Sequence, residues 1–349
     1  MKSFLKKQWF LFVLLCVVAF GCLVPGPGVY IKDELGLNFF IFIMLFLMSF
    51  TLRTQQIWAA VTNYKGLAIA LTTGYAVVGG MNFLAAKLLF SGRPDLFVGL
   101  VVVGAVPCTL VSAAVWTRLA GGNDALALST TIASNGINFL VAPVMLNLML
   151  AGYLAGRVEL PVSMMAWKIF LVVLLPVTLG QLARAPRWSG EFADRVKKPV
   201  SVIGRLIILT VVLVAGSKVG KQFAGHGAAA IGIGAIAMLE AAIAVSHVSA
   251  LLAAYFLMKL VRAEAGDCTA AAFAGSQKTL PLAIWLVENF FGSGDLAFAV
   301  LPALLYHATQ LMIDSALMGY LSPGGKGEGV KDAPAPAPPS PPAPPAASA

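Results

Sequence analysis

The chain has 349 residues, of which 59% are hydrophobic and only 11% are charged. Charged residues make up about 25% of an ordinary soluble domain, so this composition excludes a soluble globular protein and indicates a polytopic protein embedded in the lipid bilayer. The net charge of +9 does not indicate a nucleic-acid partner, because the lysines and arginines stand singly at the ends of apolar segments rather than on one basic face. The four cysteines show no metal-ligand spacing, and we expect no cofactor.

Ten apolar segments follow one another along the chain, and each is long enough to cross about 30 Å of hydrocarbon as a helix. They span 9–24, 36–52, 66–90, 96–117, 124–151, 161–182, 199–216, 228–258, 269–291 and 296–321. The first could also be a signal peptide, but an uncleaved span is favoured because no soluble domain follows it. Residues 322–349 contain an Ala-Pro run that predicts a disordered tail.

Lysines and arginines are distributed unequally between the two sides of this topology. With the N-terminus inside, 16 of the 24 lie on the cytoplasmic side and 7 on the opposite side, which leaves Lys278 within the membrane. The positive-inside rule therefore places both termini in the cytoplasm. We expect the protein in a bacterial cytoplasmic (inner) membrane, as a monomer.

The ninth segment contains the polar stretch Ala274 to Leu282, in the order Ala-Gly-Ser-Gln-Lys-Thr-Leu-Pro-Leu. Gly275 and Pro281 weaken a continuous helix, and a lysine at mid-membrane costs about 2.5–3.5 kcal/mol on insertion scales. A broken helix is therefore predicted here, and such breaks occur where the backbone is buried in protein or lines a cavity. The alternative is a kinked helix whose Lys278 reaches the interface.

A shift of 171 residues brings the second half of the chain onto the first. It superimposes three pairs of residues: Gly275 on Gly104, Gly292 on Gly121 and Asp295 on Asp124. Lys278 then falls on Pro107, which interrupts the fourth segment in the same way. Because each half has five segments, an odd number, the second half must enter the membrane inverted relative to the first. This arrangement is typical of secondary transporters.

The fifth segment carries polar side chains on one face, because Thr131, Ser134, Asn135 and Asn138 recur at three- and four-residue spacing. This face is expected to look toward the two broken helices, where half-helix ends offer positive dipoles to an anion and carbonyls to a cation. Its side chains could equally pack helices together or line a site.

Lys278, Glu240 and Asp314 are charged residues deep in apolar segments. A buried lysine needs a carboxylate or loses its proton, and Glu240 is the expected partner because Asp314 lies closer to a segment end. His247 and His307 are expected to be packing residues rather than proton carriers.

Several motifs together resemble the bile acid:sodium symporter family, in particular the branch that includes sodium/bile acid cotransporter 7. They are Met48–Arg53, Val106–Ser112, Ala120–Ala125, Gly180–Arg184, Gly275–Leu280 and Leu301–His307. The resemblance implies an all-α fold of ten transmembrane helices in two inverted five-helix repeats, with broken helices 4 and 9 crossing at the midplane.

The resemblance also implies two parts within a transmembrane domain of residues 1–321: a panel of 9–52 and 161–219, and a core of 66–151 and 228–321. The site would lie at the crossing. The substrate-binding candidates are Pro107, Thr109, Ser112, Asn135, Glu240, Ser276, Gln277, Lys278 and Thr279.

The sodium ligands of the family are only partly matched. Sodium-coupled members read Glu-x-Gly-x-Gln-Asn in helix 9, whereas this chain has Phe273 in place of the glutamate and Lys278 in place of the asparagine. The family's Ser-Asn pair in helix 4 falls on Ala113 and Ala114, and a threonine ligand of helix 5 falls on Ala133. The candidate sodium ligands that remain are Ser112, Ser129 and Gln277.

The sequence thus predicts a secondary active transporter that moves a small or amphipathic organic anion by alternating access. Its sodium site is degraded, and the coupling ion could be sodium or a proton, or coupling could be absent. The alternative is a non-transporting or regulatory membrane protein on the same fold. An enzyme is not expected, because no nucleophile with a base and no carboxylate pair converges in the sequence.

Overall fold

The protein is described here by a computed structural model that covers residues 9–53, 63–109, 112–154, 161–226, 231–291, 296 and 298–323. Every regular element within these ranges is helical. Five helices are long and apolar enough to cross a membrane, or six if the bent pair Phe12–Leu23 and Gly26–Leu35 counts as one span. Gly292, Asp295 and most of the predicted tail lie outside the described residues.

Helices occupy each of the ten predicted segments. In the first half they are α2 (Trp9–Leu23), α3 (Gly26–Tyr30), η1 (Ile31–Leu35), α4 (Leu37–Phe50), α6 (Tyr64–Thr72), η2 (Thr73–Val77), α7 (Val78–Leu89), α8 (Pro94–Ala105), α9 (Ser112–Leu119) and α10 (Asp124–Leu150). In the second half they are α11 (Val162–Ile169), η3 (Phe170–Leu174), α12 (Leu175–Arg184), α13 (Arg187–Arg195), α14 (Lys197–His226), α15 (Ile233–Leu260), α16 (Ala265–Ser276), α17 (Leu280–Phe290) and α18 (Leu301–Leu317).

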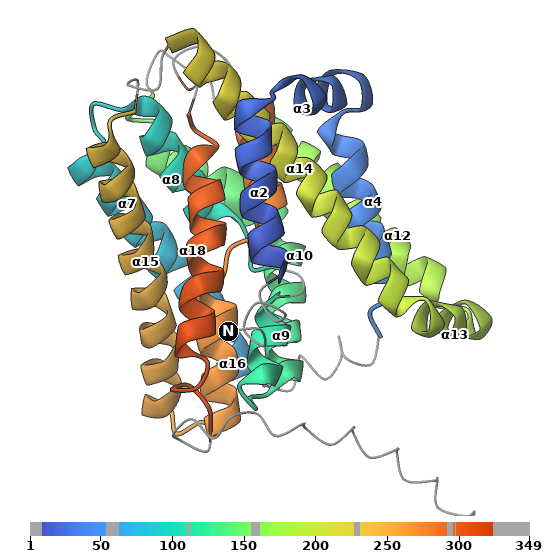
Figure 1. Cartoon of the computed structure of the whole chain (residues 1–349). Helices are drawn as coiled ribbons and strands as arrows, with labels where there is room; N and C mark the ends of the chain where they lie inside the picture. Colours follow the sequence, from blue (N-terminus) through green and yellow to red (C-terminus); the bar gives the residue numbers. More distant parts are fainter. Residues whose placement is uncertain are drawn as a thin grey trace, which may run out of the picture.

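The helices pack in two groups. In the first helix group α2, α3 and α4 pack on α14, and α4 also packs on α12. The short η1 packs on α3 and α4, and α13 packs on α12 and α14. The helix α11 precedes η3 and α12 in the chain and packs on α10 of the second helix group. The second helix group contains α6 to α10 and α15 to α18, in which α15 packs on α16 and α18 and α7 packs on α8. Figure 1 shows α4, α12 and α14 inclined together on one side, and α7, α15 and α18 on the other.

Two helices of the second group are interrupted where the polar and proline residues occur. The helix α8 ends at Ala105 and α9 begins at Ser112, with extended backbone at Val106. The helix α16 ends at Ser276 and α17 begins at Leu280. Pro281 fits the first turn of α17, where a missing N–H breaks no helical hydrogen bond. Both bounds of α8, 94 and 105, differ by 171 from those of α16, 265 and 276.

Two glycines allow the interrupted helices to approach their neighbours closely. A Cβ atom at Gly104 would lie 2.8 Å from the Cα of Gly79 on α7, and one at Gly275 would collide with the hydroxyl of Thr73 on η2. Both contacts are too short for a side chain larger than hydrogen. Gly104 and Gly275, which pair at the 171-residue shift, therefore serve the same purpose in both halves.

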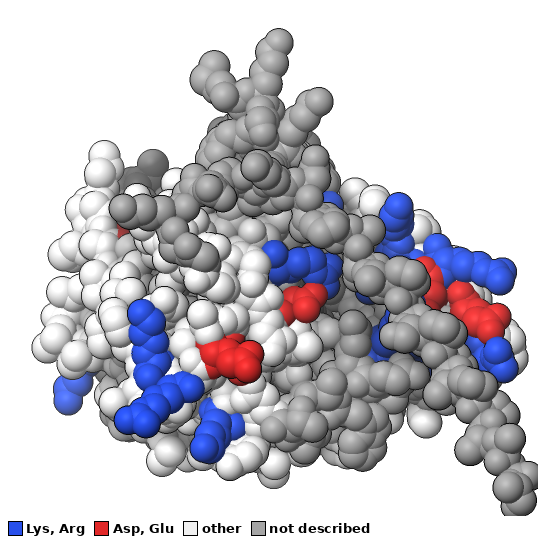
Figure 2. Space-filling view, turned by 90° about the horizontal axis from the view of Figure 1, so that it is seen from below, with Lys and Arg blue, Asp and Glu red and all other residues white. Residues whose placement is uncertain are grey.

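The end of the molecule where α13 lies is rich in basic residues. Figure 2 views this end and shows Lys and Arg side chains distributed across it. Here Asp194 forms ion pairs with Arg184 at 2.7 Å and with Arg53 at 3.1 Å. Partial burial raises the pKa of Asp194, but hydrogen bonds from the two guanidinium groups outweigh it and hold the pKa below its ordinary value.

Candidate functional site

The two interrupted helices meet at their breaks. Lys278 is buried, with 3% of its surface exposed, and its Nζ donates to the carbonyl oxygens of Gly104 at 2.9 Å and Val106 at 2.8 Å. The backbone N–H of Thr279 donates to the carbonyl of Pro107 at 2.9 Å. Carbonyls at the C-terminal end of a helix carry partial negative charge and have no helical partner. Lys278 therefore satisfies the open end of α8 from the opposite break.

Gln277 links the break to three other side chains. Its Oε1 accepts hydrogen bonds from Thr109 Oγ1 at 2.6 Å and from Ser112 Oγ at 2.7 Å. Its Nε2 donates to Asp314 Oδ2 on α18 at 2.5 Å. The side-chain amide thus connects the break of α8 and α9 to α18, and both of its ends are occupied.

The polar face of α10 binds the opened backbone of the first break. Asn135 Nδ2 donates to the carbonyl of Cys108 at 3.0 Å, and Thr131 Oγ1 donates to that of Thr109 at 3.1 Å. Ser134 Oγ accepts from the N–H of Cys108 at 3.2 Å. Buried backbone groups need such partners, so these three side chains replace the helical hydrogen bonds that the break removes.

The second break is satisfied in the same manner by α18. Gln310 accepts from the N–H of Lys278 at 2.8 Å and donates to its carbonyl at 3.0 Å. Tyr306 donates to the carbonyl of Ser276 at 3.0 Å. Tyr306 and Asn135 are 171 residues apart, and each binds a carbonyl next to a break. This correspondence was available in the sequence as a polar residue at each of the two positions.

A buried pair of titratable groups, His247 on α15 and Asp314 on α18, lies next to the second break. His247 Nε2 is 3.0 Å from Asp314 Oδ1, its Nδ1 is 3.2 Å from the carbonyl of Ser276, and both side chains are fully buried. A carbonyl only accepts, so Nδ1 must carry a hydrogen. The contact between Nε2 and the carboxyl oxygen then requires a further proton. His247 is buried with both ring nitrogens in contact, as predicted for a packing residue, and Asp314 lies three residues before the end of α18, as predicted. The contact between the two side chains was not predicted.

The predicted pairing of Lys278 with Glu240 was also wrong. Glu240 accepts a hydrogen bond from Thr309 on α18, and its second carboxyl oxygen has no partner among the described residues. Lys278 turns instead to the carbonyls of α8. Backbone carbonyl oxygens at a helix end thus replace a carboxylate as the partner of the lysine. The sequence does not show this partner, because it depends on how the two interrupted helices cross.

The candidate sodium ligands do not come together. Ser112 and Gln277 are in contact through the 2.7 Å hydrogen bond. Ser129, however, donates to the carbonyl of Ala125 within its own helix α10. Such intrahelical bonds are the ordinary fate of serine in a membrane helix.

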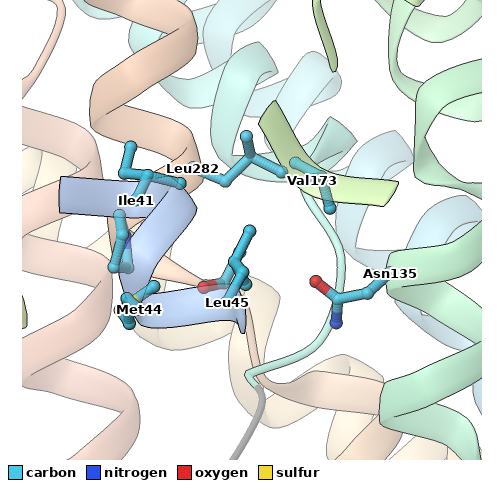
Figure 3. A pocket seen from close by; sticks show the side chains of 8 residues that line it. Ile41, Met44, Leu45, Asn135, Val173 and Leu282 are labelled. Carbon is cyan, nitrogen blue, oxygen red and sulfur yellow. The ribbon is translucent and has the colours of Figure 1, made fainter. Parts of the chain in front are cut away.

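A small cavity lies between the two helix groups beside the second break. Asn135, Thr279, Pro281 and Leu282 line it from the second helix group, and Ile41, Met44, Leu45 and Val173 line it from the first. Figure 3 shows the polar end of Asn135 facing the apolar side chains of α4 across this space. Of the predicted substrate residues, only Asn135 and Thr279 reach the cavity. Pro107, Thr109, Ser112, Ser276, Gln277 and Lys278 instead make the contacts of the crossing.

Comparison with known proteins places this arrangement in a transporter family. The family model described as "SBF-like CPA transporter family" matches residues 8–322. The chain is 28% identical to the "Probable sodium/metabolite cotransporter BASS4, chloroplastic" of Arabidopsis thaliana, over 82% of this chain and 66% of that protein. It is 25% identical to "Sodium/bile acid cotransporter 7" of Rattus norvegicus, over 90% and 92% of the two chains. It is 28% identical to "Putative symporter YfeH" of Escherichia coli (strain K12), over 64% and 65%.

Proposed function

This chain belongs to the SBF-like CPA transporter family, and from that premise we propose that it is a secondary active transporter of a small or amphipathic organic anion. Membership places it among transporters rather than enzymes. The observation that carries the proposal is the buried Lys278, whose Nζ occupies the carbonyl end of α8 at the crossing of two interrupted helices. A charged side chain at such a place marks a transport pathway.

The proposed architecture has ten crossings in two inverted five-helix repeats, with the breaks at the membrane midplane. Support comes from the 171-residue relation of α8 to α16 and of Asn135 to Tyr306. The first helix group corresponds to the panel, 9–52 and 161–219, and the second to the core, 66–151 and 228–321. Alternating access would then be a movement of one group against the other around the crossing.

The substrate site is proposed at the cavity between the two helix groups. Asn135 and Thr279 offer polar groups there, while Ile41, Met44 and Leu45 offer an apolar wall. This combination suits a ligand with one polar end and an apolar body. Lys278 lies one residue from Thr279, and it contributes the positive charge that favours an anion.

The coupling ion is proposed to be other than sodium. Sodium requires several oxygen ligands in one place, and the only oxygens of the candidate set that meet are those of Ser112 and Gln277, where hydroxyl donors already occupy Gln277 Oε1. Lys278 would take the electrostatic role of the bound cation. Coupling to protons, or uncoupled transport, remains compatible with this site.

The basic end around α13 is proposed to face the cytoplasm, together with both termini, in a bacterial inner membrane. In this orientation the tail of residues 322–349 is cytoplasmic. The protein is proposed to act as a monomer.

A regulatory membrane protein on the same fold is the competing function, and it would not need a cavity that opens to both sides.

Cysteine accessibility distinguishes the two functions. Thr279→Cys is introduced after Cys16, Cys22, Cys108 and Cys268 are replaced by alanine, and a membrane-impermeant maleimide is applied to right-side-out and to inverted vesicles. A transporter exposes this position to both sides in turn, so labelling is expected in both preparations. Lys87→Cys, at an exposed position on α7, is the control and should react from one side only. Labelling of Thr279→Cys from one side or from neither would favour the regulator.

A further inference from the structure

A second buried group of charges lies away from the crossing, near the C-terminal end of α17. Glu288 is buried, with 2% of its side chain exposed, and each of its carboxyl oxygens faces one lysine. Lys32 Nζ on η1 is 2.5 Å from Oε2, and Lys218 Nζ on α14 is 2.8 Å from Oε1. Lys218 is itself largely buried, with 11% exposed. Two positive charges therefore share one negative charge, with Glu288 and Lys218 largely buried and the Lys32 side chain 40% exposed.

These ion pairs join the two helix groups. Glu288 belongs to the second group, whereas Lys32 and Lys218 both belong to the first. Among the ion pairs of the described residues, these two are the pairs that cross between the groups. One turn earlier on α17, Trp285 Nε1 donates to Asn38 Oδ1 on α4 at 2.5 Å. The same face of α17 is thus held to the first helix group at two successive turns.

Any movement that separates the two groups at this end must remove Glu288 from both lysines. No other carboxylate pairs with Lys32 or Lys218 in the part of the chain that the structure describes. A largely buried ammonium that loses its carboxylate is strongly destabilised, because its desolvation is no longer compensated. Lys218 therefore requires a replacement anion when this end opens, and Lys32, whose side chain is 40% exposed, can bind the same anion from the solvent side.

We propose that Lys32 and Lys218 form a binding site for the carboxylate or other anionic group of the transported substrate, and that Glu288 occupies this site when the end is closed. The inference rests on the proposed transport function and adds a second anion site to it. Glu288 lies ten residues beyond Lys278, about 15 Å along a helix, so the site would bind the anion before it reaches the crossing. An arriving anion replaces Glu288 as the partner of the two lysines. The two helix groups can then separate without leaving the lysine ammonium groups unpaired.

The test measures protection of Lys218 in the purified full-length protein. The variant Glu288→Gln removes the internal anion, and acetylation of Lys218 by sulfosuccinimidyl acetate is followed by mass spectrometry. Benzoate is the probe anion, and benzamide, its neutral isostere, is the control ligand. Benzoate should slow acetylation of Lys218 several-fold in Glu288→Gln, and benzamide should not. Lys221, an exposed lysine on the same helix that has no ion pair among the described residues, should react equally in all conditions.

Chemical rescue gives a second measurement. Glu288→Gln should lower the melting temperature, and benzoate should restore part of the loss while benzamide does not, because only an anion replaces the missing charge. If Glu288→Gln does not fold, Glu288→Asp, whose shorter side chain weakens both pairs but keeps the charge, is used for the protection assay. Equal protection of Lys218 and Lys221, or no protection by benzoate, would overturn the proposal. Neither measurement involves transport, so the result is independent of the Thr279→Cys test.

Discussion

The two interrupted helices have the same backbone plan but opposite electrostatic roles. The break between α8 and α9 exposes carbonyl oxygens, and its own residues supply no charge. The break between α16 and α17 supplies Lys278 and Gln277, which reach across to the first break. At the 171-residue shift Lys278 stands where the first half has Pro107. The comparison indicates that the internal symmetry sets where the helices open, while one asymmetric residue sets what the opening binds.

Removal of the Lys278 amino group should have the largest effect. Lys278→Met keeps the length of the side chain but leaves the carbonyls of Gly104 and Val106 without their donor, which costs about 1–3 kcal/mol for each unpaired group. The melting temperature should fall markedly, and uptake of the transported organic anion by proteoliposomes should be lost. Lys87→Met, which removes an exposed lysine from α7, is the control and should change neither. Normal uptake by Lys278→Met would show that the two breaks do not depend on this residue.

A second substitution, Glu240→Gln in the Lys278→Met variant, tests which group is the partner of Lys278. A carboxylate that paired with Lys278 would be left uncompensated in Lys278→Met, and Glu240→Gln would then restore stability. The structure pairs Glu240 with Thr309 instead. The double variant should therefore be no more stable than Lys278→Met alone. A double-mutant cycle with a large coupling energy between positions 240 and 278 would contradict the observed partners.

The second break also depends on a carboxyl group that the first break lacks. In Asp314→Asn the new amide can donate to His247 Nε2 and accept from Gln277 Nε2, which reproduces the protonated pair. In Asp314→Leu both neighbours lose their partner at a cost of about 1–3 kcal/mol each. Thermal unfolding should show Asp314→Asn close to the wild type and Asp314→Leu well below it. Equal losses in both variants would mean that the pair holds no extra proton.

The ion pairs of Asp194 should give the smallest effect, because Asp194 and Arg53 are exposed and water screens their charges, although the Arg184 side chain is buried. The pKa of Asp194 is lowered in the folded protein, so its contribution to stability is present above the unfolded pKa and is lost as the pH falls through the folded pKa. Asp194→Asn should slightly lower the melting temperature at pH 7. The difference from the wild type should shrink below about pH 4. A difference that grows on acidification would contradict the assigned sign.

The positions of the helices and of their breaks could be predicted from the sequence, because apolar length, proline and glycine act locally. The polar stretch around Lys278 and the glycines at 104 and 275 carried that information. The partners of the charged residues could not be predicted. His247 and Asp314 are 67 residues apart in the chain, and nothing in either helix signals that they meet.

The direction in which side chains and backbone carbonyls point could not be predicted from the sequence either. A lysine in a membrane segment suggests a carboxylate partner, but the orientation of α8 presents carbonyls to it instead. Ser129 likewise faces its own backbone rather than the crossing. At the start of α10, Asn123 Oδ1 accepts from the N–H of Leu126, whereas the neighbouring Asp124 pairs with Arg118. Each of these outcomes depends on rotation about a helix axis, which residue types alone do not determine.

We propose that Lys278 takes the place of a bound sodium ion between the two breaks. The most direct test is the melting temperature of the purified wild-type protein in sodium, potassium and choline chloride at constant ionic strength. A ligand that binds the folded state must stabilise it, so a protein with a working sodium site responds selectively to sodium. We predict the same melting temperature in all three salts. A saturable rise in millimolar sodium, absent in potassium and choline, would show that the protein has a sodium site and that Lys278 does not replace the ion.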